Sequence, residues 1–146
     1  MLVDRRTWKA IDDHRSDYVN MIGMCVRDIV PPYIDRWAAV NPADVARVVP
    51  TVRELFDIEV VDDELPDLDR FHAEIDLAII RDAKTRFRDW KSDMREHFED
   101  HGGFENPETA NSAIPSTVKS PDAWARVVDR FCTLEFQVYS LFILCI

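Results

Sequence analysis

Glycine and cysteine are scarce in this chain of 146 residues, which contains three of each. So few glycines leave little material for tight turns and favour long regular elements, and two of the three stand together at Gly102 and Gly103. The cysteines are odd in number and lack a Cys-x-x-Cys spacing, so they indicate neither a disulfide framework nor a zinc knuckle. We therefore expect a mainly helical protein of a reducing compartment.

Long hydrophobic runs are missing from most of the chain. The most apolar segment, VYSLFILCI at residues 138–146, is less than half of the roughly 20 residues that a membrane helix needs. The opening MLVDRRTWKAIDDH carries charge throughout, which does not fit a secretory signal. We therefore expect no membrane span and an intracellular location.

A complete catalytic motif is also missing. The sequence has no G-x-S-x-G, no phosphate-binding glycine loop and no dinucleotide fingerprint. Asp62-Asp63-Glu64 spells the catalytic letters of transposases, but three successive side chains point in different directions. Two-metal chemistry needs carboxylates that converge from separate elements on ions about 4 Å apart. We therefore interpret these acids as solvated linker residues and predict a protein that is not an enzyme and has no cofactor.

Charge is plentiful and unevenly distributed. The chain has 28 acidic and 18 basic residues, which gives a net charge of −10. Residues 57–76 hold nine acids and one arginine, a balance of −8, so the rest of the chain is almost neutral. The nine acids are Asp57, Glu59, Asp62, Asp63, Glu64, Asp67, Asp69, Glu74 and Asp76. This distribution argues against a general polyanion binder, although it leaves local contact with nucleic acid open.

Apolar residues recur at helical spacing through most of the chain, which predicts an all-α fold. We expect a first helix over about residues 16–29 and a second, opened by an Asn-Pro pair, over about 42–56. Pro50 falls inside the second pattern, where a proline kinks or splits a helix. The one strand candidate is the short segment 58–61.

The longest helix is expected over about residues 67–100, before Gly102 and Gly103 end it. Eight apolar residues keep to one face there, at spacings of three and four. They are Phe71, Ile75, Ile79, Ala83, Phe87, Trp90, Met94 and Phe98. After a spacer at 104–119 that we expect to be irregular, a Ser-Pro-Asp sequence opens a last helix over about 121–137.

The large side chains of these last two helices allow two interpretations. Aromatic rings can form a platform for stacking nucleic-acid bases, but stripes of them at helical spacing normally pack in a core. We therefore assign five residues to the core: Phe87, Trp90, Met94, Trp124 and Phe131.

Five cations share another stripe of the long helix. They are Arg81, Lys84, Arg88, Lys91 and Arg95, at spacings of three and four. Such a stripe can neutralise a run of phosphates, with weak and sequence-independent binding of DNA. More commonly it is a solvated face whose pairs of opposite charge support the helix. Both interpretations follow from the sequence, and the second is the commoner case.

His97 and His101 are four residues apart, the spacing of many metal-binding pairs. The residues between them do not form the HExxH signature, and no third ligand follows at a fixed spacing. We therefore predict two helix-end histidines that complement the helix dipole and hold no metal.

The order of features over residues 84–137 is distinctive: an arginine-rich helix that ends near a histidine, a spacer, and a helix that opens on a tryptophan and closes on an acidic-Phe-Gln run. The residues that carry this order are Arg88, Trp90, the His97 region, Trp124 and Glu135-Phe136-Gln137. The order resembles that of the plant transposase family of the Ptta and En/Spm class. A looser similarity extends over residues 27–58. By this resemblance, the matching residues are structural.

The resemblance implies one helical transposase-like domain over residues 1–137 and a nuclear protein, or a cytoplasmic one if the resemblance fails. Members of the family continue into a polar, basic segment, whereas this sequence changes to the apolar tail at 138–146, as in a truncated or altered member. We thus predict a non-catalytic helical module of a transposon-encoded or transposon-derived protein, which binds an unknown protein partner or itself. The alternative is an accessory domain that contacts nucleic acid through Arg81 to Arg95.

Overall fold

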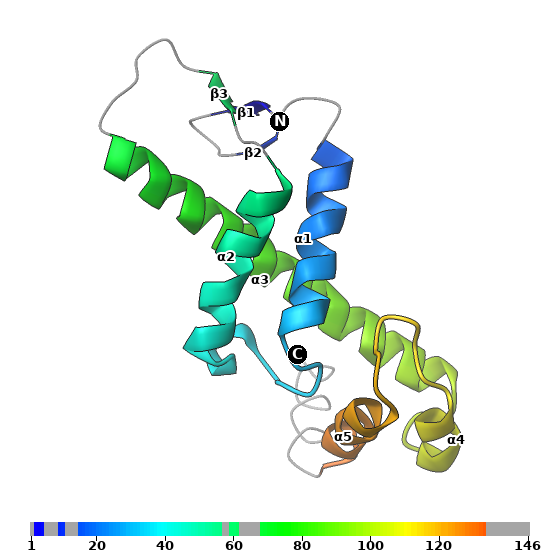
Figure 1. Ribbon diagram of the computed structural model, residues 1–146. Coiled ribbons are helices and arrows are strands. Elements are labelled where there is room, and N and C mark those ends of the chain that lie inside the picture. The colour runs from blue at the N-terminus through cyan, green and yellow to red at the C-terminus, as the bar shows by residue number, and fades with distance from the viewer. Residues whose placement is uncertain (1, 5–8, 11–14, 57–58, 62–67, 134–146) are drawn as a thin grey trace, which may run out of the picture. The chain divides into compact units, whose positions relative to one another are not determined.

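The computed structural model describes residues 2–4, 9–10, 15–56, 59–61 and 68–133 (Figure 1). Helices make up most of these residues, so the predicted all-α class is confirmed. The helices are α1 (Arg15–Ile29), the 3-10 turn η1 (Trp37–Ala39), α2 (Pro42–Leu55), α3 (Leu68–Asp100), α4 (Pro107–Ser112) and α5 (Pro121–Phe131).

A small sheet accompanies the helices. Its strands are β1 (Leu2–Asp4), β2 (Lys9–Ala10) and β3 (Glu59–Val61), in the order β2-β1-β3. The central strand pairs antiparallel with β2 and parallel with β3. The one strand candidate in the sequence, at 58–61, contains β3. The sequence does not predict β1 and β2, since strands of two or three residues are too short to show an alternating pattern.

The long helix α3 covers Leu68–Asp100, as the apolar row predicts. Its end is set by two glycines with positive φ, Gly102 at 126° and Gly103 at 56°. The amide of Gly103 donates to the carbonyl oxygen of Phe98 over 2.9 Å, the bond that closes a Schellman motif. A Cβ on Gly102 would lie 2.4 Å from the carbonyl oxygen of Asn106, so both the backbone angle and the space require glycine there.

Three helices begin in the same way, with a capping side chain and then proline at the first helical position. The capping oxygens accept from backbone amides two or three residues on, at 2.9 to 3.4 Å. The pairs are Asn41-Pro42, Asn106-Pro107 and Ser120-Pro121. The second pair opens α4, so the prediction of an irregular spacer over 104–119 is wrong for residues 107–112. A helix of six residues is too short to show an apolar period, but its start signal is in the sequence.

One other predicted boundary needs correction. The last helix, expected to about residue 137, ends at Phe131. Just after this end, the amide and the hydroxyl of Thr133 both donate to the carbonyl oxygen of Arg130, at 3.2 and 2.8 Å, in a tight turn. Residues 134–137 and the tail 138–146 lie outside the described residues, as does Asp62-Asp63-Glu64. Of the two outcomes expected at Pro50, a kink or a split, the split does not occur, because the second helix is continuous through this residue.

The chain divides into two compact units. The single transposase-like domain over 1–137 stays a prediction. The first comprises Met1–Val30 and Arg36–Arg88, and the second comprises Pro31–Asp35 and Asp89–Ile146. In the first unit, α1 packs beside α2 (Figure 1). Its core contains buried side chains from both helices and from α3: Tyr18, Ile22, Val26, Val48, Val52, Ile75, Ile79, Ala83 and Phe87.

The second unit packs α4 and α5 with the end of α3. Two indoles are buried in it and each has a hydrogen bond. Trp90 Nε1 donates to Thr117 Oγ1 over 3.1 Å, and Trp124 Nε1 donates to the carbonyl oxygen of Ala110 over 2.9 Å. The five side chains that the sequence assigns to the core are each at most 3% exposed. They are Phe87, Trp90, Met94, Trp124 and Phe131.

Candidate functional site

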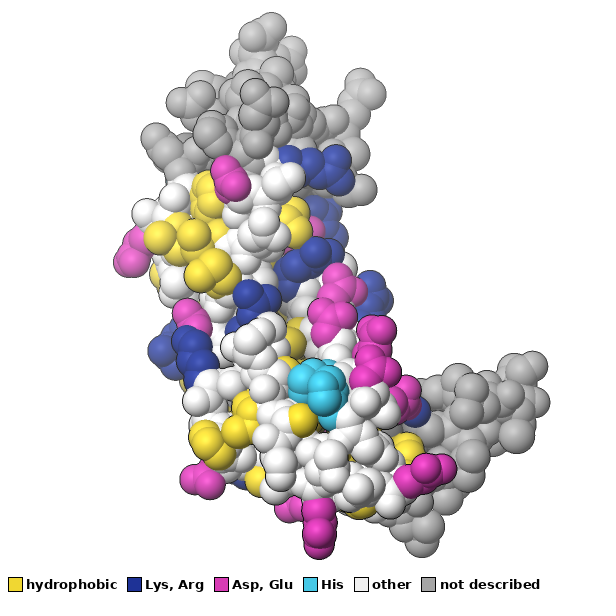
Figure 2. Space-filling view, turned by 90° about the vertical axis from the view of Figure 1, so that its right-hand side faces the viewer, with side chains coloured by type: hydrophobic (Ala, Val, Ile, Leu, Met, Phe, Trp, Pro, Cys, Tyr) yellow, Lys and Arg dark blue, Asp and Glu magenta, His cyan; other side chains and the backbone are white. Residues whose placement is uncertain are grey.

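The basic stripe divides between the two units. Arg81, Lys84 and Arg88 belong to the first unit, where all three are exposed. The guanidinium of Arg81 lies 3.2 Å from a carboxylate oxygen of Asp82, its neighbour in sequence. On the face shown in Figure 2, acidic and basic side chains are interspersed. Phosphate that approaches Arg81 would therefore also meet the carboxylate of Asp82.

The two cations of the stripe that lie in the second unit, Lys91 and Arg95, each contact another group of this chain. Lys91 Nζ donates to the carbonyl oxygen of Pro32 over 2.8 Å. Burial lowers the pKa of Lys91 to about 8, which the charge of Asp35 partly offsets. Arg95 Nε lies 3.1 Å from Glu99 Oε1, one helical turn away. The engagement of Lys91 leaves at most four of the five cations to contact phosphate, and Arg95 would have to exchange its carboxylate partner.

The two histidines lie at the end of α3 with their rings stacked 4.0 Å apart. His97 Nε2 lies 2.6 Å from the carbonyl oxygen of Ala113, and His101 Nδ1 lies 2.7 Å from the carbonyl oxygen of His97. Because a carbonyl oxygen only accepts, both of these ring nitrogens carry a proton and neither is a metal ligand in this arrangement. His97 also packs edge-on against Trp124. Across the described residues, His, Cys, Asp and Glu form no group of three or more that suits a metal ion.

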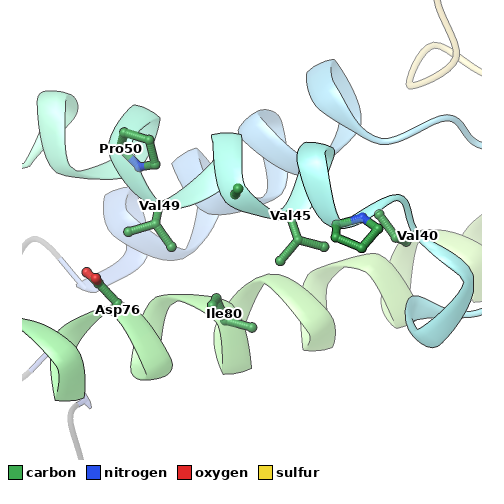
Figure 3. Close-up of a pocket in the computed structure, with 8 residues that line it drawn as sticks. Val40, Val45, Val49, Pro50, Asp76 and Ile80 are labelled. Atoms are coloured by element: carbon green, nitrogen blue, oxygen red, sulfur yellow. The ribbon is translucent and has the colours of Figure 1, made fainter.

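A groove on the first unit is a different kind of site, which the sequence analysis does not predict (Figure 3). It is open to solvent and holds about 550 Å³. Seven of its eight lining residues are apolar, and the eighth is acidic. They are Val40, Pro42, Val45, Ala46, Val49, Pro50 and Ile80, with Asp76.

The groove exists because α2 carries two apolar stripes. Val48 and Val52 are completely buried and belong to the core. The residues at 42, 45, 46, 49 and 50 form a second stripe at helical spacing, and they line the groove. Val45 and Val49 are half-buried, whereas Ala46 and Pro50 are exposed. One stripe suffices to pack a helix onto a core, so the second is apolar surface that the described residues leave uncovered.

The groove has an ionic end. Arg53 Nη2 lies 2.6 Å from Asp76 Oδ1, and it also donates to the carbonyl oxygen of His72 over 3.0 Å. Arg53 thus connects α2 to α3 beside the groove. The approach to Asp76 is an ion pair without hydrogen-bond alignment, since Asp76 Oδ1 and Arg53 Nε are buried and make no hydrogen bond. The Asp76 side chain as a whole is 44% exposed, which leaves its other oxygen open to solvent or to a partner.

Two further apolar side chains are exposed on the same two helices. Leu55 ends α2 and is 51% exposed, and Leu77 follows Asp76 on α3 and is 67% exposed. Single exposed apolar side chains are common on protein surfaces, so the groove, rather than these two leucines, defines the candidate site. The spacing of the second α2 stripe is the one trace of the groove in the sequence, but spacing alone does not distinguish this stripe from the core stripe.

No family model, no curated protein and no solved structure matches this chain. The resemblance to plant transposases therefore rests on the order of residues in the sequence. Among the described helices, none is both long enough and apolar enough to cross a bilayer.

Proposed function

We propose that this chain is a non-catalytic helical module of a plant transposon-encoded or transposon-derived protein, and that it binds a protein partner through the groove on α2 and α3. The observation that carries the binding proposal is the second apolar stripe of α2. That stripe contributes little to the core, since its two valines are only half-buried and its alanine and second proline are exposed. The transposon origin is supported by the residue order over 84–137.

The size of the groove supports a peptide-like ligand. The stripe on α2 runs from Pro42 to Pro50, which corresponds to roughly 12 Å of helix, or a little over two turns. A site of this length and composition suits the apolar face of one segment of a partner protein. Burying the apolar surface on both sides would stabilise the complex by the hydrophobic effect.

The alternative of an accessory nucleic-acid-contacting domain has less support. Of its five cations, Lys91 is held by Pro32 and Arg95 lies beside Glu99. Acidic side chains on the same helix add repulsion toward phosphate. Lys84 and Arg88 are exposed, and contact with nucleic acid through them would be weak and non-specific.

A display selection tests the proposed function. A library of helical peptides is selected against the full chain, and a parallel selection uses a Val49→Glu variant, which places a charge in the groove. We expect peptides with an apolar face to be enriched against the wild-type chain and lost against the variant. Circular dichroism must show that the variant keeps its helices. Enrichment that is equal for both proteins, or absent for both, would overturn the groove as the binding site.

A further inference from the structure

We infer that Lys91 is a site of carbamate formation, at which the neutral amine adds carbon dioxide and the carboxylate so formed pairs with Arg130. This modification is independent of the groove on α2 and α3, because all residues that carry the inference belong to the second unit. It follows from the charges around the loop Pro31–Asp35, the hydrogen bond of Lys91 and the state of its amine.

The loop Pro31–Asp35 is held by cations from two helices. Lys91 Nζ of α3 donates to the carbonyl oxygen of Pro32 over 2.8 Å. Arg130 of α5 contacts both carboxylate oxygens of Asp35, at 2.7 and 2.8 Å. Asp35 is the one acid in the loop, so a single carboxylate balances two cations.

A third cation adds to this excess of positive charge. Arg126, one turn before Arg130 on α5, lies over the ring of Tyr33, with its guanidinium carbon 3.6 Å from the ring centre. Three positive charges and one negative charge give the group a balance of +2. Carbamate formation replaces the positive charge of Lys91 with a negative one, which leaves two charges of each sign. A partly buried group of charges is more stable when its opposite charges are equal in number.

The amine can add carbon dioxide without losing its bond to the loop. A neutral lysine amine has two protons and a lone pair, and the lone pair attacks the carbon atom of carbon dioxide. An N–C bond forms, the π electrons of one C=O bond move to its oxygen, and the nitrogen releases one proton to solvent. The carbamate nitrogen of Lys91 keeps the other proton, which donates to the carbonyl oxygen of Pro32 as the ammonium group does.

The amine of Lys91 is neutral more often than that of an ordinary lysine. Burial lowers the pKa of Lys91 from 10.5 to about 8; the charge of Asp35 partly offsets this shift, and that of Arg130 adds to it. At about pH 8 roughly half of the population is therefore neutral, against roughly 0.3% for a pKa of 10.5. The side chain is only partly exposed, so a small molecule such as carbon dioxide reaches it more easily than an acyl group on a large carrier.

The carbamate matches Arg130 in shape and in charge. Its two oxygens share one negative charge, like those of the Asp35 carboxylate that Arg130 already contacts with two nitrogens. A guanidinium has five N–H donors in one plane, so it can serve two such groups. An acetyl group on Lys91 would remove a positive charge but would supply no negative one. The site therefore favours a carbamate over an acetylated lysine.

The test uses the full chain at about pH 8 with isotopically labelled bicarbonate, which supplies dissolved carbon dioxide. Carbon NMR measures the amount of carbamate, and its dependence on carbon dioxide concentration gives an equilibrium constant. Trapping with triethyloxonium converts each carbamate to a stable ethyl ester, which mass spectrometry of the peptides then locates. We expect the occupancy of Lys91 to exceed that of the exposed Lys84 and Lys119 at least about tenfold.

Four substitutions test the roles of the neighbouring groups. Lys91→Arg keeps the positive charge but removes the amine, so the carbamate signal of this site should disappear. Arg130→Gln removes the partner of the carboxylate and should lower the equilibrium constant about tenfold. Arg126→Gln is the matched control, since it removes an exposed cation from the same helix, and should change the constant less than about threefold. Asp35→Asn should raise the constant about threefold, because it removes the charge that favours the protonated amine and leaves Arg130 to the carbamate.

A carbamate on Lys91 that weakens in Arg130→Gln and strengthens in Asp35→Asn supports the inference. Its absence from Lys91, equal occupancy of the mapped lysines, or a signal unchanged by Lys91→Arg overturns it. Equal effects of Arg130→Gln and Arg126→Gln also overturn it, because total charge would then be the cause. Circular dichroism shows whether each variant keeps its helices, and if a variant unfolds, the peptide map of the wild type and the Lys91→Arg spectrum decide the question.

Discussion

The ammonium group of Lys91 donates a hydrogen bond to the carbonyl oxygen of Pro32, 59 positions earlier in the chain, over 2.8 Å. This bond ties the loop Pro31–Asp35 to α3 within the second unit. Arg130 of α5 reaches the same loop, through a two-pronged ion pair with Asp35 at 2.7 and 2.8 Å. A short loop is thereby held by two cations from two helices.

The buried ammonium predicts a rise in stability with pH. The pKa of Lys91 falls from 10.5 to about 8 in the folded protein, mainly because of burial. Between these values the unfolded chain binds more protons than the folded one, so raising the pH from about 8 to 10.5 stabilises the fold. The cost of burying the charge is fully present below pH 8 and is relieved above it.

The comparison that isolates this effect is between the wild-type chain and Lys91→Met. We expect the wild type to gain on the order of 1–2 kcal/mol relative to the variant as the pH rises through this window. Urea unfolding at several pH values measures the difference, in which the titrations of tyrosines and cysteines common to both proteins cancel. Parallel stability curves for the two proteins would contradict the prediction.

The buried indole of Trp90 should contribute both volume and one hydrogen bond. Trp90→Ala is expected to destabilise the protein by about 3–5 kcal/mol, because a large cavity remains. Trp90→Phe keeps most of the ring but leaves Thr117 without its donor, which should cost about 1–2 kcal/mol from the bond and a further cavity term. Thermal unfolding measures both. If Trp90→Ala has an effect below about 1 kcal/mol, the ring does not belong to the core.

Two glycines should respond in opposite ways to the same substitution. Gly102→Ala places a Cβ 2.4 Å from a backbone oxygen at a φ of 126°, so we expect a loss of at least about 2 kcal/mol. Gly23→Ala, inside α1, meets the flexible guanidinium of Arg27 at 3.1 Å and should gain up to about 1 kcal/mol from helix propensity. The free energies of unfolding of the two variants, each compared with that of the wild type, test this prediction. A stable Gly102→Ala protein would show that α3 ends differently.

The engaged cations set a limit on any affinity for DNA. With Lys91 held by Pro32, at most four cations of the stripe remain as phosphate contacts, and Arg81 and Arg95 would have to exchange their carboxylate partners. The logarithm of a duplex-binding constant should then fall with that of salt concentration with a slope no steeper than about −4. Titration of labelled duplex measures it for the wild type and for a variant with Gln at all five stripe positions. Steep salt dependence that this variant abolishes would restore the nucleic-acid interpretation.

The sequence predicts the parts of this fold that depend on long, regular patterns. Eight apolar positions at spacings of three and four specify α3 and the burial of Trp90, because few other structures bury one face over so many turns. Shorter patterns fail: α4 has only six residues and the strands two or three, too few for a period to emerge. The end of α5 lies at a tight turn in which Thr133 bonds to Arg130, a local contact that no periodicity reveals.

The candidate site was missed for a different physical reason. An apolar residue at helical spacing counts as core until the packing shows which faces are covered, so the stripe at Val45 and Val49 could not be told from the one at Val48 and Val52. The stripe of cations is visible in the sequence, but the bond from Lys91 to Pro32 links positions 59 apart. Only the tertiary structure shows that the ammonium group of Lys91 already donates a hydrogen bond within the chain.

The two stripes of α2 also determine which kinds of change this helix tolerates. Stability depends on Val48 and Val52, and by our proposal recognition depends on Val45 and Val49, so substitutions can alter either property separately. A single inserted or deleted residue near the start of α2 has a different effect, because it rotates everything that follows by about 100°. Such a change would turn the side chains at Val45 and Val49 away from the groove. It would also turn the core side chains at Val48 and Val52 toward solvent. Substitutions at exposed positions of α2 are therefore tolerated more easily than any change in its length between Pro42 and Leu55.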